Sequence, residues 1–133
     1  MDQLDTQILK LLKQDGRKSN LSIAKEVGVS EGSIRKRLLK LKESGVIQRF
    51  TIQTKNAVGA ILNVKTAPEI ATSEISKQIK SIGALRVFEV AGRYEIVCYI
   101  QAESLQEIND YVEQIRAING VKETQTLPVL KED

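Results

Sequence analysis

Five basic residues lie within eight positions of the sequence, which concentrates positive charge in one short segment: Arg35, Lys36, Arg37, Lys40 and Lys42. Guanidinium and ammonium groups at this density bind phosphate oxygens well, but they also keep an ordinary helix surface solvated. The pattern therefore leaves two alternatives, a helix that binds a polyanion and a helix with a plain basic surface.

Residue types that usually carry acid–base or metal chemistry are scarce. The chain has no histidine, and its single cysteine, Cys98, lies in the apolar run 96–100. This composition excludes an internal disulfide and argues against a metal site and against most hydrolytic enzymes. We expect Cys98 to be a buried structural thiol, and we expect neither a cofactor nor an enzymatic activity.

Charge is divided unevenly along the chain. Residues 1–55 hold twelve Lys and Arg against six Asp and Glu, a net charge of +6, whereas residues 56–133 carry a net charge of −3. Such a division suggests that only the first half meets a polyanion. No apolar run approaches the roughly 18 residues that a bilayer span needs, so we expect a cytoplasmic protein without membrane contact.

Periodic apolar residues predict three helices in residues 1–50, the range expected for the first domain. Asp2 is placed to cap the first helix, which ends at Asp15-Gly16, and Ser19 or Asn20 can cap the second. Gly28 ends the second helix, and Ser30 caps a third that stops at Gly45. Two short helices joined by Gly-Val-Ser form a helix-turn-helix pattern.

On the third helix the basic residues lie away from the predicted core. Ile34, Leu38 and Leu41 form the buried stripe, because residues on a helix are separated by about 100°. A recognition helix places its N-terminal residues at base edges and its basic residues on the DNA strands. We therefore predict that Ser33 and Lys36 contact the groove floor, and that phosphates are bound by Arg35, Arg37 and Lys40.

Residues 46–53 alternate between apolar and polar side chains, as a half-buried strand does. The segment is expected to form either a small wing of the DNA-binding domain or a tether. Arg49 and Lys55 could contact the DNA backbone from it. Residues 51–57 are expected to form a linker strand between the domains.

Residues 58–133 show a strand–helix–strand–strand–helix–strand order, which is typical of an α+β, ferredoxin-like domain. The first strand ends before Pro68, and Thr72 or Ser73 is expected to cap the following helix. Gly92-Arg93 predicts a type II′ hairpin turn, and Ser104 with Glu107 predicts a capping box. The last strand is expected over residues 121–130.

Motifs along nearly the whole chain resemble the prokaryotic Lrp/AsnC (feast/famine) family of transcription regulators, of the archaeal type. The matching residues are Leu4-Asp5, Ile8-Leu9, Asp15-Gly16-Arg17, Ile23-Ala24, residues 27–30, Arg37, Leu41, residues 43–47, Gly92-Arg93-Tyr94-Glu95, Gly120-Val121, Thr124 and Thr126. The resemblance implies a DNA-binding regulator that forms dimers and assembles them into tetramers or octamers. It also implies a small amino-acid effector, bound by Gly92, Tyr94, Glu95, Thr124 and Thr126. Glu95 stands where the family usually has Asp.

Two other functions remain as alternatives. Some relatives of the family look like tetrapyrrole decarboxylases, but these rely on histidine, which this chain lacks. The second alternative is an amino-acid-sensing or assembly module with no specific DNA target.

Overall fold

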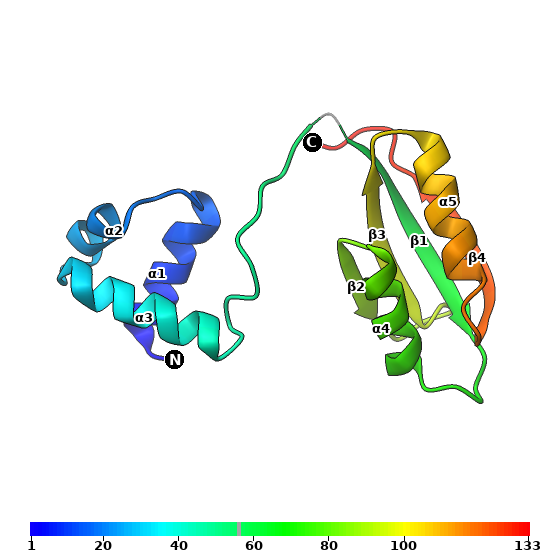
Figure 1. The fold of residues 1–133 in the computed structure, drawn as a ribbon, viewed down its shortest axis with the longest axis horizontal. Helices are drawn as coiled ribbons and strands as arrows, with labels where there is room; N and C mark the ends of the chain where they lie inside the picture. The colour runs from blue at the N-terminus through cyan, green and yellow to red at the C-terminus, as the bar shows by residue number, and fades with distance from the viewer. Residues whose placement is uncertain (56) are drawn as a thin grey trace. The chain divides into compact units, whose positions relative to one another are not determined.

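The computed structural model describes residues 1–55 and 57–133, and the chain divides into two compact units, Met1–Gln53 and Thr54–Asp133 (Figure 1). The division falls inside the range 51–57, where the sequence predicts the linker. No helix in the described part of the chain is long and apolar enough to cross a membrane.

The N-terminal unit consists of three helices, α1 (Gln3–Gln14), α2 (Asn20–Val27) and α3 (Glu31–Glu43), as the sequence predicts. Each helix begins at a residue whose side chain accepts a backbone hydrogen bond, and these N-caps are Asp2, Ser19 and Ser30. Gly28 ends α2 in the left-handed conformation, with φ of 79°. The small core of the unit is formed by Ile8, Ile23, Ala24 and Ile34.

The strand predicted over residues 46–53 does not form, and neither does the predicted linker strand within residues 51–55 and 57. Asn56 lies outside the described residues. An alternating pattern gives a strand only when a neighbouring strand satisfies its backbone groups, and the described part of this chain provides no such neighbour. The N-terminal unit is therefore a helix-turn-helix unit without a wing.

The C-terminal unit has the predicted βαββαβ order. Its elements are β1 (Val58–Thr66), α4 (Thr72–Ile82), β2 (Arg86–Glu89), β3 (Ile96–Ala102), α5 (Leu105–Arg116) and β4 (Val121–Pro128). The strands form one antiparallel sheet in the order β2-β3-β1-β4, the ferredoxin-like arrangement. Both helices pack on one face of this sheet.

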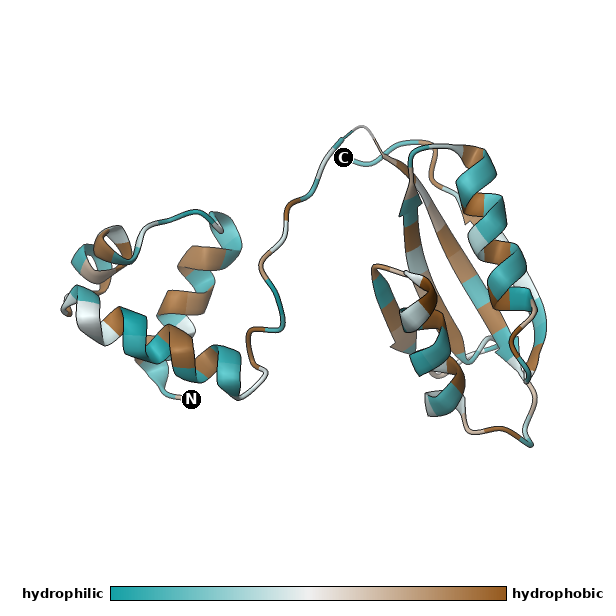
Figure 2. Cartoon of the chain, viewed as in Figure 1, coloured by the Kyte–Doolittle hydropathy of each residue, from teal (hydrophilic) through white to brown (hydrophobic). Residues whose placement is uncertain are grey.

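Alternate residues of β1 and β3 form the centre of the C-terminal core together with α4 and α5 (Figure 2). Leu62 pairs with Cys98 across the two strands, and both side chains are buried. Cys98 is only 1% exposed, as the sequence predicts for a buried thiol, and this burial raises its pKa to about 11.

Two local predictions for this unit were wrong, and a third was correct only in part. Ala71, not Thr72 or Ser73, occupies the N-cap of α4, and no side chain caps that helix. Strand register places Gly92-Arg93 at the tip of the β2–β3 hairpin, but Gly92 lacks the positive φ that a type II′ turn requires. Ser104 caps α5 as predicted, because its hydroxyl oxygen accepts from the Glu107 N–H at 3.2 Å, but the Glu107 side chain accepts from the N–H of Glu103 at 2.8 Å and not from that of Ser104. The type of residue at a cap or turn position therefore does not decide these three geometries.

Candidate nucleic-acid interface and effector site

The outer surface of α3 forms one wall of an open groove. Ser33, Arg35, Lys36, Arg37 and Lys40 all line it, and Met1, Asp2 and Asp5 contribute from the start of α1. The structure therefore brings together all five residues that the sequence predicts for DNA contact. It also adds two carboxylates that sequence reasoning missed.

Lys36 and Lys40 lie one helical turn apart on the exposed side of α3. Neither ammonium has an ion-pair partner among residues 1–55 and 57–133. Ser33, in the first turn, is half-buried, and its N–H donates to the Ser30 hydroxyl oxygen at 3.2 Å. These groups can meet an external ligand without breaking an internal contact.

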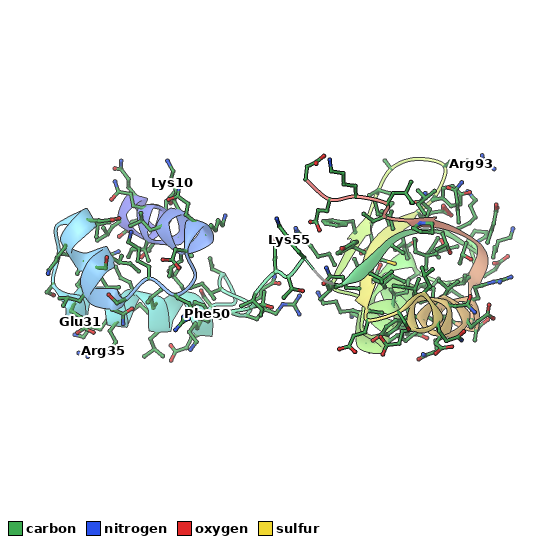
Figure 3. The ribbon with its side chains drawn as sticks, turned by 90° about the horizontal axis from the view of Figure 1, so that it is seen from above. Lys10, Glu31, Arg35, Phe50, Lys55 and Arg93 are labelled. Carbon is green, nitrogen blue, oxygen red and sulfur yellow. The ribbon has the colours of Figure 1, made fainter. Side chains whose placement is uncertain are left out.

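Arg35 points away from the N-terminal unit, on the opposite side from Lys10 of α1 (Figure 3). Its side chain is 70% exposed, and its Nη1 lies 3.3 Å from Oε2 of Glu31. An exposed pair of this i,i+4 type contributes only about 0.3 to 0.5 kcal/mol. A phosphate can therefore replace Glu31 as the partner of Arg35 at small cost.

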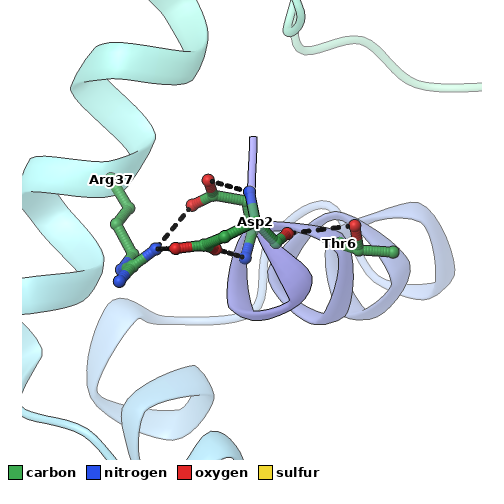
Figure 4. Close-up of polar contacts among 4 residues, drawn as sticks. Asp2, Thr6 and Arg37 are labelled. Atoms are coloured by element: carbon green, nitrogen blue, oxygen red, sulfur yellow. Dashed lines mark hydrogen bonds and ion pairs between the residues drawn. The ribbon is translucent and has the colours of Figure 1, made fainter.

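Arg37 differs from its neighbours because it is held inside the unit (Figure 4). Its Nη1 donates to both carboxylate oxygens of Asp2, at 2.9 and 2.7 Å, and to Oδ1 of Asp5 at 3.1 Å. The hydrogen bond from Arg37, followed by that from the Asp5 backbone, lowers the pKa of Asp2 to about 2. The two carboxylates in turn raise the pKa of Arg37. The predicted phosphate contact of Arg37 would have to compete with this pair.

The effector residues predicted in the C-terminal unit lie at two places in the sheet. Glu95, at the β2–β3 hairpin, accepts hydrogen bonds through Oε1 from the N–H and hydroxyl of Thr66, at 3.2 and 3.3 Å. Its Oε2 lies 3.4 Å from Nζ of Lys65. Burial would raise the pKa of Glu95, but the bonds from Thr66 and Lys65 outweigh it and lower that pKa.

Lys65 also donates to the backbone oxygen of Arg93 at 2.8 Å, so it ties the hairpin to β1. Gly92 is exposed at the tip of that hairpin, and Tyr94 is half-buried with its ring 5.6 Å from the Arg93 guanidinium. Sequence reasoning missed Lys65 and Thr66. Their only signal was a lysine and a threonine at the end of a strand.

Thr124 and Thr126 lie on β4, opposite Val64 and Leu62 of β1. Directly paired residues point to the same face of a sheet, so both threonines are on the face covered by the helices. Glu95, which contacts Lys65 and Thr66, lies across β1 from them. Within a single chain, the structure does not gather the five predicted effector residues into one cluster.

The second face of the sheet has no helix over it, and apolar side chains occupy much of it. Tyr99, Ile61 and Leu127 are adjacent across β3, β1 and β4, and Phe88 and Val97 are paired in the next row. Ile61, Phe88 and Leu127 remain 38 to 44% exposed. The Tyr99 ring lies directly over Gly59, where an added Cβ would be 2.5 Å from the phenol oxygen. This flat apolar surface is defined here as the open face.

Both halves of the chain match known family models. The AsnC-type helix-turn-helix domain matches residues 1–42, and the Lrp/AsnC ligand binding domain matches residues 59–132. The chain belongs to the Lrp/AsnC family. It is a helix-turn-helix transcriptional regulator with a ligand-binding domain, as the sequence predicts, and its relatives are regulators rather than enzymes.

The similar proteins include archaeal regulators of nearly the same length. The HTH-type transcriptional regulator LysM of Sulfurisphaera tokodaii is 41% identical, over 98% of this chain and 96% of its own. The regulator FL11 of Pyrococcus abyssi is 34% identical, over 98% and 90%.

Solved structures share the fold at lower identity. The leucine response regulatory protein LrpA of Mycobacterium tuberculosis is 20% identical, covers 99% of this chain and 94% of its own, and superposes with a TM-score of 0.82. AsnC of E. coli is 24% identical, covers 99% and 93%, and superposes with a TM-score of 0.70.

Proposed function

We propose that this Lrp/AsnC protein binds specific double-stranded DNA sites through the outer surface of α3, as a homo-oligomer whose affinity responds to a small amino acid. The observation that carries the proposal is the pair Lys36 and Lys40, two exposed ammonium groups without an internal partner in the described structure, on a helix capped by Ser30. Such a helix can enter the major groove with its N-terminal residues at the base edges.

Within this proposal Ser33 and Lys36 read base edges, because they lie in the first turns of α3 and face outward. Arg35 and Lys40 contact phosphates on the two sides of the groove. Glu31 releases Arg35 when DNA binds. Charged contacts of this kind make affinity strongly dependent on salt, with a log–log slope of about 0.9 per phosphate.

A single short helix covers few base pairs, so specific binding requires two copies of the unit on two half-sites about one helical turn apart. The open face supplies a surface for a second copy, because its apolar side chains would leave water when two sheets pack together. The acidic C-terminal half can assemble the oligomer while staying away from phosphates. We propose a dimer through the open face, and tetramers or octamers built from it.

The DNA-binding proposal is tested by selecting bound fragments from genomic DNA with the purified protein. The selected duplex then serves as operator for Lys36→Gln/Lys40→Gln, with affinity measured between about 50 and 200 mM salt. We expect weaker binding and a slope that is shallower by about 0.9, because only Lys40 of the two residues is assigned to a phosphate. Lys10→Gln/Lys13→Gln removes the same charge from α1, where Lys10 faces away from Arg35 (Figure 3), and should bind nearly like the wild type. Equal losses in both variants would contradict the assignment of the interface to α3.

The effector proposal depends on the hairpin around Glu95 and on the threonines of β4. The ion pair of Glu95 with Lys65 has no net charge, which suits a small amino acid whose own two charges also cancel. We expect one or more amino acids from a complete panel to raise the melting temperature and to change operator affinity. Tyr94→Ala and Thr126→Val should weaken that response, whereas Ser73→Ala on the outer side of α4 should not.

The alternative function, an amino-acid-sensing or assembly module, keeps the C-terminal properties and drops the DNA target. A protein that oligomerises and responds to amino acids, but selects no fragment above background, would favour this alternative.

A further inference from the structure

Arg37 occupies an intermediate position on α3, between the buried stripe and the exposed surface. Its side chain is 30% exposed, compared with 70% for Arg35, although both residues carry the same group on the same helix. The difference arises because the Arg37 guanidinium points toward the start of α1 (Figure 4).

The carboxylates that hold Arg37 also form the N-cap of α1. The Asp5 N–H donates to Oδ1 of Asp2 at 2.9 Å, and the Asp2 N–H donates to Oδ2 of Asp5 at 3.1 Å. One polar cluster, Asp2, Asp5 and Arg37, therefore joins the first turn of α1 to the middle of α3. We name it the α1–α3 clamp.

The clamp supplies what the core of the N-terminal unit lacks, a directional contact on this side of α3. Ile8 and Ile34 bring α1 and α3 together by apolar packing, which is non-directional and permits small rotations of a helix about its axis. Hydrogen bonds between charged groups are short and directional, so they define that rotation. Ser33 lies one turn before Arg37, and Lys36 lies directly beside it. The direction in which these two side chains point therefore depends on the rotation of α3.

We propose that Arg37 is a positioning residue for DNA recognition and not a phosphate contact. This inference rests on the proposed function of α3. Through Asp2 and Asp5, Arg37 sets the orientation in which Ser33 and Lys36 reach base edges. Only Nη1 of the guanidinium contacts the carboxylates, so a phosphate would have to bind at Nη2 or Nε. There it would lie beside two carboxylates, whose negative charges would repel it.

The two roles predict different effects on specificity. Base readout requires well-placed side chains, whereas phosphate contacts contribute to binding of any sequence. Loss of a positioning residue therefore lowers affinity for the operator and leaves affinity for an unrelated duplex unchanged. Loss of a phosphate contact lowers both affinities together and makes the salt dependence shallower.

The test uses the full chain and the variant Arg37→Gln/Asp5→Asn. The net charge of the clamp is −1 in the wild type and −1 in this variant, so a change in long-range electrostatics does not obscure the result. The matched control, Arg35→Gln/Glu31→Gln, removes an exposed pair from the same helix without changing its net charge. Affinities for the selected operator and for an unrelated duplex are measured across salt, with far-UV circular dichroism to follow the helices.

For Arg37→Gln/Asp5→Asn we expect operator affinity to fall by about 5- to 100-fold, the equivalent of one lost base contact. Affinity for the unrelated duplex should stay within about 2-fold, and the slope should not change. For the control, the log–log slope of affinity against salt should become shallower by about 0.9 on both duplexes. The inference would be overturned if the slope of the clamp variant became shallower by about 0.9, or if its affinity for both duplexes were unchanged.

Arg37→Lys decides the matter if the double variant unfolds. An ammonium keeps a phosphate contact but makes a poorer clamp between two carboxylates. We expect an intermediate loss on the operator alone, and wild-type affinity for both duplexes would overturn the inference. If the wild type itself does not prefer its selected operator, the proposed function fails and the inference fails with it. If the wild type shows that preference and the variants retain it, only the inference fails.

Discussion

The two units of this regulator differ in how they present their surfaces. The N-terminal unit packs three capped helices around a small core, and its helix α3 displays lysine and arginine at helical spacing. The C-terminal unit has a much larger core but covers only one face of its sheet. A polyanion-binding surface thus needs only charges on a rigid helix, whereas a surface for a protein partner arises where apolar residues are left uncovered.

The largest expected effect comes from placing a charge on the open face. Ile61→Asp sets a carboxylate between Tyr99 and Leu127, and burying it unpaired in a dimer costs about 3 to 5 kcal/mol. The dimer Kd should rise by more than about 100-fold. Light scattering after size exclusion should report monomers at concentrations where the wild type is oligomeric.

Leu105→Asp provides the control for this prediction. Leu105 is 64% exposed on α5, on the helix side of the sheet. Its replacement should leave the oligomer intact. If Leu105→Asp separates the subunits and Ile61→Asp does not, the partner surface lies on the helices and the comparison between the two units is wrong.

Core substitutions should separate the stabilities of the two units. Ile8→Ala and Ile75→Ala each remove a fully buried side chain, one from each core, and each should cost about 2 to 5 kcal/mol locally. All three tyrosines, Tyr94, Tyr99 and Tyr111, belong to the C-terminal unit. The tyrosine band of the near-UV circular dichroism spectrum therefore follows that unit alone, whereas far-UV signals follow both.

We expect Ile8→Ala to lower the melting temperature in the far ultraviolet and to leave the tyrosine transition in place. Ile75→Ala should lower the tyrosine transition. A single coincident transition in both variants would mean that the two units unfold as one.

Helix caps offer a smaller test of the same contrast. Ser30→Ala removes the side-chain cap of α3 and should cost about 1 kcal/mol, because a backbone N–H loses its acceptor. Ala71→Ser adds the cap that α4 lacks, and should stabilise the C-terminal unit by about 0.5 to 1 kcal/mol. Ser73→Ala, one residue into α4, should stay within about 0.5 kcal/mol, and a larger loss would mean that Ser73 caps the helix in solution. Chemical denaturation measures all three.

The smallest expected effect is the acid sensitivity of the N-terminal unit. The pKa of Asp2 falls from its usual value of 3.8 to about 2 in the folded state, through the hydrogen bonds from Arg37 and the Asp5 backbone. A lowered folded pKa stabilises the protein fully above the usual value, and this stabilisation is lost as the pH falls through about 2. The melting temperature followed by the far-UV helical signal should therefore fall between pH 4 and pH 2. Asp2→Asn should make that fall smaller. An identical pH profile for the variant would exclude a contribution from this carboxylate.

Local patterns predicted most of the fold. The caps Asp2 and Ser30, the three helices and the βαββαβ order follow from side-chain spacing and from residues that bond to their own neighbouring backbone. The wrong strand prediction depended on a partner elsewhere in the chain. Residues 46–53 have the alternation of a strand but no neighbouring strand in the described chain. The N-cap of α4 is Ala71 although two better capping residues follow it, so residue type alone does not place a cap.

The candidate sites divide in the same way. Helical periodicity alone places Lys36 and Lys40 on the outer surface of α3, because the buried stripe of the same helix determines which side faces water. Arg37 lies on the flank of that stripe, where periodicity does not decide between solvent and a neighbour 32 or 35 residues away. The pairing of β4 with β1 likewise decides that Thr124 and Thr126 face the helices.

The sequence alone was sufficient for the helices and for the strands of the C-terminal unit, for the division of charge between the halves and for the outward face of the basic helix. Each of these depends on interactions within a few residues or on composition. The tertiary structure alone decided that Asp2 and Asp5 hold Arg37, that Lys65 and Thr66 engage Glu95, and that one sheet face is uncovered. These are contacts between distant segments, and their geometry comes from packing and strand register, which no local pattern encodes.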